Sequence, residues 1–323
     1  MAKAIRIYEP GGPENMKFED VDVPAPGEGE ILIKQDFCGL NYIDVYHRTG
    51  LYPLEMPNGI GLEAAGVVTG VGAGVTEFAE GDRVAYAAPP IGAYASERVM
   101  PWHRVVKLPD TISNEQAAGM MLQGMTVEYL IRRTYAVQPG DTVLFQAAAG
   151  GVGLIACQWL KQIGATVIGT AGSPEKAELA KQHGCDHVIL YREEDVAKKV
   201  REITDGAGVP VVYDGVGADT VDGSLDSLKP RGLFVSFGNA SGPIQNFNLA
   251  TLSAKGSLFM TRPTLMTYTA SREDMVESSS ALFDAVAKGL KIEVNQRYSL
   301  ADATQAHLDL EARKTTGSTL LVV

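Results

Sequence analysis

Cysteine and histidine are both scarce in this chain. Its 323 residues include three cysteines, Cys38, Cys157 and Cys185, and five histidines. No two cysteines are spaced as CxxC, which excludes a zinc ribbon and a thiol redox motif. The histidines show no ligand spacing. An odd, low cysteine count is typical of a reducing compartment, so we expect a cytoplasmic protein.

Clustered basic charge and long apolar runs are missing as well. The net charge is −11, and the longest basic block, Lys198-Lys199 with Arg201 nearby, fits the solvated face of a helix. Nucleic acid is therefore not an expected partner, because binding to a phosphate backbone relies on clustered Lys and Arg. No run reaches the roughly 18 apolar residues of a membrane span. The first residues carry charges where a secretory signal has an apolar core, so we expect a soluble protein with no membrane partner.

Length and composition predict two folded domains of ordinary globular character. Hydrophobic residues make up 45% of the chain and charged residues 21%. Residues 1–110 are rich in Gly and Pro and hold short alternating strands, for example 31–35, 65–71 and 83–87, which predicts a mainly-β unit. Residues from about Glu115 to Arg133 are predicted to be helical and to lead into a second domain.

The most informative segment runs from Pro139 to Lys161. A β-rich run, Thr142 to Gln146, is followed by a glycine-rich turn, Ala147 to Gly153, and then by a helical pattern to about Ile163. A strand, a glycine turn and a helix open a dinucleotide-binding unit, in which the helix N-terminus faces a pyrophosphate. Written as GxGxxG, the turn has Ala148 at its first position, so the motif alone is weak. A tight turn without a ligand is the alternative.

The sequence after this turn keeps alternating between strand-like and helix-like segments. The expected strands are 166–170, 187–190, 209–213, 232–237 and 257–260, and the expected helices are 175–183, 195–204 and 220–228. With the run at 142–146 this gives six strands joined by crossovers. The pattern predicts an α/β domain with a doubly wound parallel sheet of the Rossmann type.

The 139–161 segment resembles the signature of the quinone oxidoreductase (zeta-crystallin) branch of the medium-chain dehydrogenase/reductase superfamily, in particular its bacterial NADPH:quinone reductases. The shared residues are Gly140, Asp141, Leu144, Ala148, Ala149, Gly150, Gly151, Gly153, Gln158 and Lys161. The likeness extends along the chain through motifs at 10–14, 26–30, 61–66, 80–84, 236–239 and 261–263. It implies a GroES-like catalytic domain at 1–124, an NADP-binding Rossmann domain at 125–264, and a return segment at 265–323 that completes the catalytic domain.

The expected cofactor is NADPH. The second strand of the Rossmann pattern has no acid at its tip, where NAD-preferring sites bond the ribose hydroxyls. Gly172, Ser173, Lys176 and Tyr191 can instead meet a 2′-phosphate, and the resemblance puts the same four residues there. An ordinary exposed lysine is the alternative for Lys176. By resemblance, further cofactor contacts are expected at Gln123, Thr126, Ala149, Gly150, Gly151, Val152, Gly153, Phe237, Gly238, Asn239, Arg262, Thr315 and Gly317. For Phe237, sheet core is an equal alternative.

No metal is expected. Zinc alcohol dehydrogenases of this architecture place a cysteine in the first loop of the catalytic domain and a histidine within Gly-His-Glu. Asn41 and Leu62 stand at those positions here, and neither binds zinc. The four-cysteine structural lobe of those enzymes is missing too. The site is therefore expected to work without a Lewis acid.

Three neutral residues remain as candidates for catalysis. The resemblance places Asn41, Tyr46 and Tyr52 on a loop that faces the nicotinamide. Asn41 could orient the nicotinamide carboxamide or the substrate oxygen, and either tyrosine could bond a developing oxyanion, donate a proton or simply pack. A quinone needs little acid help, so the expected activity is hydride transfer from NADPH to a quinone. The alternatives are a 2-enoyl or alkenal reductase and a non-catalytic, crystallin-like NADPH-binding protein.

The resemblance also implies a homodimer, because members of the family commonly join the edge strands of two nucleotide domains. The apolar region Leu249–Met260 is the candidate edge. An exposed strand edge needs such a cover. The same apolar content would suit an internal strand.

Overall fold

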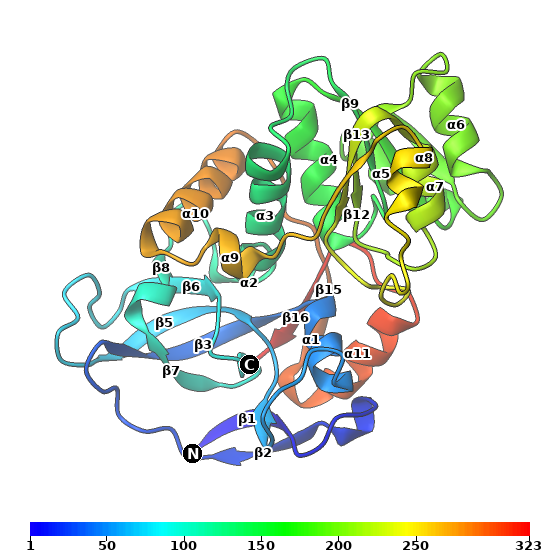
Figure 1. Cartoon of the computed structure of the whole chain (residues 1–323). Coiled ribbons are helices and arrows are strands. Elements are labelled where there is room, and N and C mark those ends of the chain that lie inside the picture. The colour runs from blue at the N-terminus through cyan, green and yellow to red at the C-terminus, as the bar shows by residue number, and fades with distance from the viewer. The chain divides into compact units, whose positions relative to one another are not determined.

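The computed structural model describes residues 1–323, and the chain divides into two compact units (Figure 1). Unit 1 comprises Met1–Met125, Thr269–Lys288 and Ile292–Val323, and unit 2 comprises Thr126–Tyr268 and Gly289–Lys291. Each unit has its own buried apolar cluster.

Unit 2 contains a six-stranded parallel sheet in the order β11-β10-β9-β12-β13-β14. Its strands are β9 (Thr142–Phe145), β10 (Thr166–Ala171), β11 (His187–Leu190), β12 (Val209–Asp214), β13 (Leu228–Ser236) and β14 (Phe259–Thr261). The central strands are buried on both faces, as their unbroken apolar runs require. The strand order reverses between β9 and β12, which confirms the predicted doubly wound Rossmann sheet.

Helices cross between these strands as the alternating pattern predicts. They are α4 (Gly151–Ile163), α5 (Pro174–Gln182), α6 (Val196–Ile203), α7 (Val221–Asp226) and α8 (Ala250–Ala254). Helix α4 packs against α5, and α6 packs against α7. Right-handed crossovers place these two pairs on opposite faces of the sheet. Local signals fix the start of α5, because Pro174 occupies its first turn and the Ser173 side chain accepts a hydrogen bond from Lys176 N–H.

Unit 1 is mainly β. A seven-stranded sheet runs in the order β15-β16-β3-β5-β6-β8, with β7 also paired to β3, and a three-stranded sheet runs β2-β1-β4. The strands are β1 (Ala2–Ile7), β2 (Lys17–Val21), β3 (Glu30–Leu40), β4 (Asn58–Gly59), β5 (Glu63–Val71), β6 (Arg83–Ala87), β7 (Glu97–Pro101), β8 (Val106–Lys107), β15 (Val294–Ser299) and β16 (Ser318–Val322). Strand β16, at the end of the chain, pairs with β3, so sequence-distant segments share one sheet.

The helices of unit 1 include one that the sequence interpretation missed. The helices are α1 (Tyr42–Thr49), α2 (Asn114–Ala118), α3 (Met121–Glu128, of which the last residues belong to unit 2), α10 (Arg272–Ala287) and α11 (Ala303–Glu311), and short 3-10 turns lie at Pro13–Asn15, Trp102–Arg104 and Leu300–Asp302. The expected loop that carries Asn41 and Tyr46 is in fact the start of α1. Asn41 is its N-cap, and the Asp44 carboxylate accepts from the Asn41 backbone N–H at 2.9 Å, which closes a capping box.

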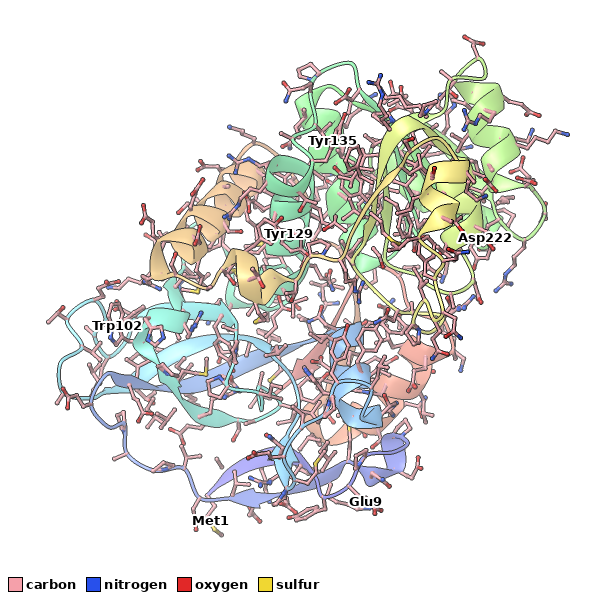
Figure 2. All side chains as sticks on the ribbon, in the orientation of Figure 1. Met1, Glu9, Trp102, Tyr129, Tyr135 and Asp222 are labelled. Carbon is pink, nitrogen blue, oxygen red and sulfur yellow. The ribbon has the colours of Figure 1, made fainter.

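The segment from about Glu115 to Arg133 is helical, as predicted, but it is divided into three pieces. Helix α2 ends at Ala118, α3 begins at Met121, and a π-helical segment follows at Tyr129–Thr134. Within unit 1, a Cβ added to Gly119 would lie 3.3 Å from the Ser318 Cβ. The break therefore lets β16 approach closely. Figure 2 labels Tyr129 on the π-helical segment, and its ring stacks on Tyr268 with centroids 4.5 Å apart.

Helix α9 (Leu265–Tyr268) completes the set. The longest helix, α10, has 16 residues. None of the helices combines the length and the apolar character that crossing a bilayer requires.

Candidate functional site

The glycine turn of unit 2 exposes backbone N–H groups at the start of α4. Gly150 is the N-cap, no side chain caps the helix, and its first turn holds no acid. The first N–H groups of a helix have no partner inside it and carry the positive end of the dipole. The turn is also tight, because a Cβ added to Gly153 would lie 2.5 Å from the Ala147 carbonyl oxygen. These features fit a pyrophosphate.

A buried hydrogen-bond chain fixes the turn from below. The Ala147 N–H donates to Thr170 Oγ1 at 3.0 Å, and Thr170 Oγ1 donates to Gln146 Oε1 at 2.7 Å. Gln146 Nε2 donates to Ser224 Oγ at 2.9 Å, and Ser224 Oγ donates to Asp214 Oδ2 at 2.7 Å. The other Asp214 oxygen accepts two backbone N–H groups. All these side chains are buried, so the chain ties together the ends of β9, β10 and β12.

Three of the four predicted phosphate residues, Gly172, Ser173 and Lys176, follow β10, and Tyr191 follows the neighbouring strand β11. A Cβ on Gly172 would lie 2.7 Å from the Tyr191 hydroxyl oxygen, so that ring covers the glycine. Ser173 caps α5 and Lys176 lies half-buried in its first turn. One acid does stand nearby: the Ser173 side chain bonds the exposed carboxylate of Glu175 and lowers its pKa. The tip of β10 itself carries no acid.

The predicted contacts after β13 also cluster. Arg262 Nη1 donates to the Gly238 carbonyl at 3.2 Å and to Ser236 Oγ at 3.3 Å. The half-buried Phe237 ring lies 5.7 Å from Phe145, so it packs on the sheet at its carboxyl end. Asn239 follows directly and is half-buried.

The remaining predicted contacts are divided between the units. In unit 2, Thr126 and Ala149 are buried. Gly151 and Val152 lie in the first turn of α4 and are partly exposed. In unit 1, Thr315 is half-buried. Gly317 has a φ of +57°, and a Cβ there would lie 2.5 Å from the Glu293 carbonyl oxygen, so only glycine suits this position.

Unit 1 brings two predicted residues together around a buried acid. Asn41 Nδ2 donates to Glu63 Oε2 at 2.7 Å, and Gln123 Nε2 donates to Asn41 Oδ1 at 3.2 Å. The Leu122 N–H donates to Glu63 Oε1 at 2.8 Å. Ser318 Oγ lies 3.0 Å from Gln123 Oε1. These side chains are at most 7% exposed, so the network is closed to solvent within the unit.

The two candidate tyrosines also meet. The rings of Tyr46 and Tyr52 pack edge to face with centroids 5.3 Å apart, and the Tyr52 N–H donates to the Tyr46 carbonyl at 3.0 Å. Tyr46 is 7% exposed and Tyr52 is half-buried. Packing therefore fixes the direction of both rings.

A second buried acid lies on the same helix as Tyr46. Asp44 Oδ2 accepts from the Tyr94 hydroxyl at 2.8 Å, and that hydroxyl lies 3.2 Å from His307 Nε2. Burial raises the pKa of Asp44 to about 7 and that of Glu63 to about 8. Burial also lowers the pKa of His307 to about 3 and that of His47 to about 4. Unit 1 thus holds two acids that are easily protonated and two histidines that stay neutral.

These donor groups do not fit zinc. Asn41 turns an N–H toward Glu63, and Leu62 is a buried apolar residue. Cys38 is buried, its thiol lies 3.0 Å from the Ala93 carbonyl, and burial raises its pKa to about 12, so it is no thiolate ligand. Tetrahedral zinc needs deprotonated Cys, neutral His or carboxylate ligands, which these positions lack.

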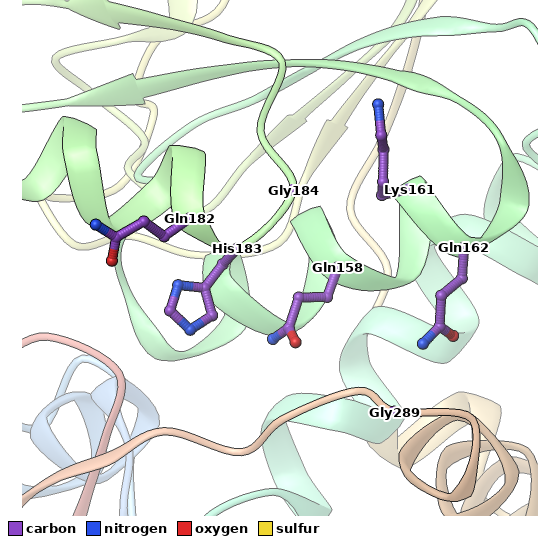
Figure 3. A pocket seen from close by; sticks show the side chains of 7 residues that line it. All are labelled: Gln158, Lys161, Gln162, Gln182, His183, Gly184 and Gly289. Atoms are coloured by element: carbon purple, nitrogen blue, oxygen red, sulfur yellow. The ribbon is translucent and has the colours of Figure 1, made fainter.

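The second half of the signature has a structural role. Gln158 accepts from the Lys291 N–H and donates to the Lys291 carbonyl, both at 2.9 Å. Lys161 pairs with Asp186, whose other oxygen accepts from the Val167 N–H at 2.9 Å. Gln158 and Lys161 also line an open depression of about 320 Å³. Figure 3 shows them with the other lining residues, Gln162, Gln182, His183, Gly184 and Gly289. Apart from Gly289, these residues lie on or just after the C-terminal parts of α4 and α5, whereas the glycine turn precedes the N-terminus of α4.

The catalytic side also depends on residues that sequence reasoning did not select. The predictions from the sequence assign no role to Glu63, Asp44 or Ser318. The Asn41-Tyr42-Ile43-Asp44 spacing is a capping-box signal that predicts α1 and the role of Asp44. No local signal identifies Ser318, which lies 195 residues from Gln123.

Comparison with known proteins defines the class first. Residues 27–110 match the alcohol dehydrogenase GroES-like domain, and residues 151–284 match the domain described as zinc-binding dehydrogenase. The molecule is therefore a dehydrogenase built from a GroES-like domain and a dinucleotide-binding domain.

Whole-chain relatives narrow that class. A quinone oxidoreductase of Pseudomonas aeruginosa is 52% identical over all of both chains. The crystal structure of Escherichia coli quinone oxidoreductase complexed with NADPH is 48% identical, with a TM-score of 0.98 over 99% of this chain and 100% of that one. A 2-haloacrylate reductase of Burkholderia is 45% identical over 100% of this chain and 99% of its own length. The chain belongs to the quinone oxidoreductase family of the medium-chain dehydrogenase/reductase superfamily.

Proposed function

We propose that this chain is a zinc-independent NADPH:quinone oxidoreductase. One structural observation carries the cofactor assignment: an uncapped α4 N-terminus lies next to a β10 tip without an acid, where Tyr191 covers Gly172. The acceptor follows from the whole-length relatives named quinone oxidoreductase. The Escherichia coli relative was solved with NADPH, which supports the same cofactor here.

Each part of the nucleotide site has a physical role in this proposal. The N–H groups at Gly151 and Val152 would hold the pyrophosphate, with Ala149, Gly150 and Gly153 leaving space for it. Ser173 and Lys176 would bind the 2′-phosphate, and Tyr191 would cover it. Lys176 also offsets the repulsion from Glu175, whose carboxylate is exposed and screened by water.

We assign the remaining predicted contacts to the rest of the nucleotide and the nicotinamide. They are Gln123, Thr126, Phe237, Gly238, Asn239, Arg262, Thr315 and Gly317. Arg262 would act by holding the Gly238 carbonyl, since it already donates to that oxygen.

Bound NADPH would supply the hydride. Asn41 would position the nicotinamide or the acceptor, because its amide is held on one side by Glu63 and on another by Gln123. Tyr46 and Tyr52 would wall the acceptor pocket and hydrogen-bond its oxygen. A quinone becomes a stabilised phenolate on reduction, so positioning without a strong acid is sufficient.

A second candidate activity is reduction of a double bond conjugated to a carbonyl or carboxylate. The observation in its favour is the whole-length relative named 2-haloacrylate reductase. Here Tyr46 or Tyr52 would have to donate a proton, because the product carbanion is more basic than a hydroquinone anion.

The test follows NADPH oxidation with a planar quinone and with a trans-2-alkenal under the same conditions, and uses NADH as the control donor. Quinone-dependent turnover with NADPH and not NADH is the expected result. Turnover with the alkenal alone would replace quinone reduction by the second activity. Turnover with neither acceptor would contradict both.

We further propose a homodimer in the cytoplasm. Strand β14 is an edge strand of the parallel sheet, and Phe259 on it is 61% exposed. Leu249, which precedes α8, is 74% exposed. Two such edges could join in one continuous sheet across a twofold axis. Three unpaired, buried cysteines suit a reducing compartment. Light scattering tests the dimer, and a monomer at micromolar concentration would contradict it.

A further inference from the structure

The network around Glu63 contains one hydroxyl that faces two acceptors. Ser318 Oγ lies 2.6 Å from the Gly119 carbonyl oxygen and 3.0 Å from Gln123 Oε1. The hydroxyl has a single proton, so it donates to one of these oxygens at a time. The acceptor that the Ser318 hydroxyl uses therefore determines the orientation of the Gln123 and Asn41 side-chain amides.

Two complete arrangements exist. With Glu63 ionised, Asn41 donates to Glu63, Gln123 donates to Asn41, and Ser318 donates to Gln123. In this arrangement the Gly119 carbonyl accepts no hydrogen bond from the Ser318 hydroxyl. With Glu63 protonated, its O–H donates to Asn41, and each amide turns over, so that Asn41 donates to Gln123 and Gln123 to Ser318.

The Ser318 hydroxyl is then released to Gly119, its closer neighbour. The protonated arrangement thus gains the bond from Ser318 to the Gly119 carbonyl, and it turns the Asn41 oxygen away from the Asp44 N–H of the capping box. The backbone N–H of Leu122 donates to Glu63 Oε1 in both arrangements. It therefore fixes the carboxyl while its other oxygen changes role.

We propose that Glu63 is a positioning residue: gain or loss of a proton at its carboxyl reverses the hydrogen-bond chain through Asn41, Gln123 and Ser318, and so exchanges the donor and acceptor atoms that Asn41 and Gln123 offer to a ligand. The ligand part rests on the proposed function, whereas the reversal does not.

The surroundings of Glu63 support a proton on this group. Burial, with a smaller contribution from the Asp44 charge, raises its pKa to about 8, although the hydrogen bonds from Asn41 and the Leu122 N–H act in the opposite direction. A Cβ on Gly39 would lie 2.2 Å from Glu63 Oε2, so β3 closes against the carboxyl. Three other titratable groups lie within electrostatic range of Glu63: Cys38 of β3, Tyr86 of β6 and Tyr94. Their pKa values are raised, so all three are neutral. One cation, Arg98 of β7, faces Cys38 and Tyr86.

The substitution Glu63→Gln imitates the protonated state. Leu122 N–H keeps the new oxygen on its side, so the new NH₂ faces Asn41 and donates to it. In the wild type the folded carboxyl holds its proton to a higher pH than the unfolded one, so stability falls as pH rises from about 4.5 to about 8. The variant lacks this loss. The difference between its melting temperature and that of the wild type should therefore grow by roughly 5 °C from pH 6 to pH 9.

Glu128→Gln is the matched control, because Glu128 is equally buried but pairs with Arg132 and Arg133. It should lower the melting temperature at both pH values. If Glu63→Gln lowers it equally at pH 6 and pH 9, Glu63 has a fixed structural role and the proposal fails.

Side-chain amide signals in NMR spectra of the free protein test the reversal directly. The NH₂ shifts of Asn41 and Gln123 should change together near pH 8 in the wild type and stay constant in Glu63→Gln. Ser318→Ala removes the additional bond of the protonated state and should move the step to lower pH. Shifts that ignore pH, or a step unaffected by Ser318→Ala, would overturn the proposal.

The kinetic arm uses kcat/KM for quinone against pH. It should change near pH 8 in the wild type, while Glu63→Gln keeps the low-pH value throughout. Absence of turnover in the wild type would refute the proposed function and leave the NMR and melting results to decide the reversal.

Discussion

Two buried hydrogen-bond chains, one in each unit, end on different backbone groups. The chain under the glycine turn starts at the Ala147 N–H and ends on the Asp214 carboxylate, which accepts two further N–H groups. The chain in the GroES-like unit starts at Glu63 and ends at the Gly119 carbonyl. The Ala147 N–H can only donate, so the hydrogen bonds of the first chain have one possible direction. In the second chain the Ser318 hydroxyl can donate either to the Gly119 carbonyl or to Gln123, so two directions are possible.

This difference matches the tasks that we propose for the two units. The pyrophosphate carries the same charge throughout the reaction, and a rigid turn suits it. The catalytic side meets groups whose charge changes, and there a reversible chain can follow a proton. Burial alone is therefore a poor guide to rigidity; the terminal partner of each chain decides.

The largest expected effect breaks the fixed chain. Asp214→Asn would turn an NH₂ toward Ser224 Oγ, which already accepts from Gln146. Reversal cannot relieve this, because the Ala147 N–H continues to donate to Thr170. One buried hydroxyl proton would be left without an acceptor, and we expect a loss of about 3 kcal/mol in the free energy of unfolding.

Urea unfolding between pH 6 and pH 9 measures this loss, which should not depend on pH. Glu63→Gln is the comparison, since its effect should change across the same range. A tolerated Asp214→Asn would show that the first chain is reversible as well.

The pH dependence of the wild type sharpens the same contrast. At pH 6.5 the histidines of the unfolded chain are about half protonated and they lose the remaining charge as pH rises, so the low pKa values of His47 and His307 oppose the slope only slightly above this pH. Asp44 and Glu63 then determine the slope. Their pKa values are raised on folding, so stability should fall by about 2–3 kcal/mol between pH 6.5 and pH 9.

Thermal melts across this range, with Asp44→Asn and Glu63→Gln each removing part of the slope, check the sign. Stability that rises with pH above 6.5 would contradict the burial of both acids.

Local sequence patterns explain why the elements around the chain from Ala147 to Asp214 could be predicted. They also explain why the chain from Glu63 to Gly119 could not. The glycine turn, its six strands and the cap at Ser173 are all set by neighbouring residues, and the fold class followed from them. Glu63 instead depends on Leu122, 59 positions away, and on Asn41. The helix break at Gly119 depends on Ser318, which reaches it only once β16 has paired with β3.

A half-buried charge, Lys176, provides a smaller effect outside both chains. Lys176→Ala should weaken NADPH binding by about 2 kcal/mol, the range of a charged hydrogen bond, and leave NADH binding unchanged. Fluorescence titration of both cofactors measures the difference. Glu175→Gln is a control that should strengthen NADPH binding slightly, because it removes a negative charge near the phosphate. Equal losses for NADPH and NADH would remove Lys176 from the phosphate site.

The smallest effect tests whether backbone partners fix direction at a partly exposed position. Gln158 bonds both the N–H and the carbonyl of Lys291, and neither can change role. Gln158→Glu therefore sets a carboxylate against a carbonyl and should cost about 1 kcal/mol at pH 8, with recovery below pH 5 as the new carboxyl takes up a proton and donates again. Melting curves at the two pH values measure this recovery. A loss of stability that persists at pH 4.5, relative to the wild type at the same pH, would mean that position 158 needs the amide for a reason other than its donor. The rule that backbone partners fix hydrogen-bond direction would then not extend from the two buried chains to the surface.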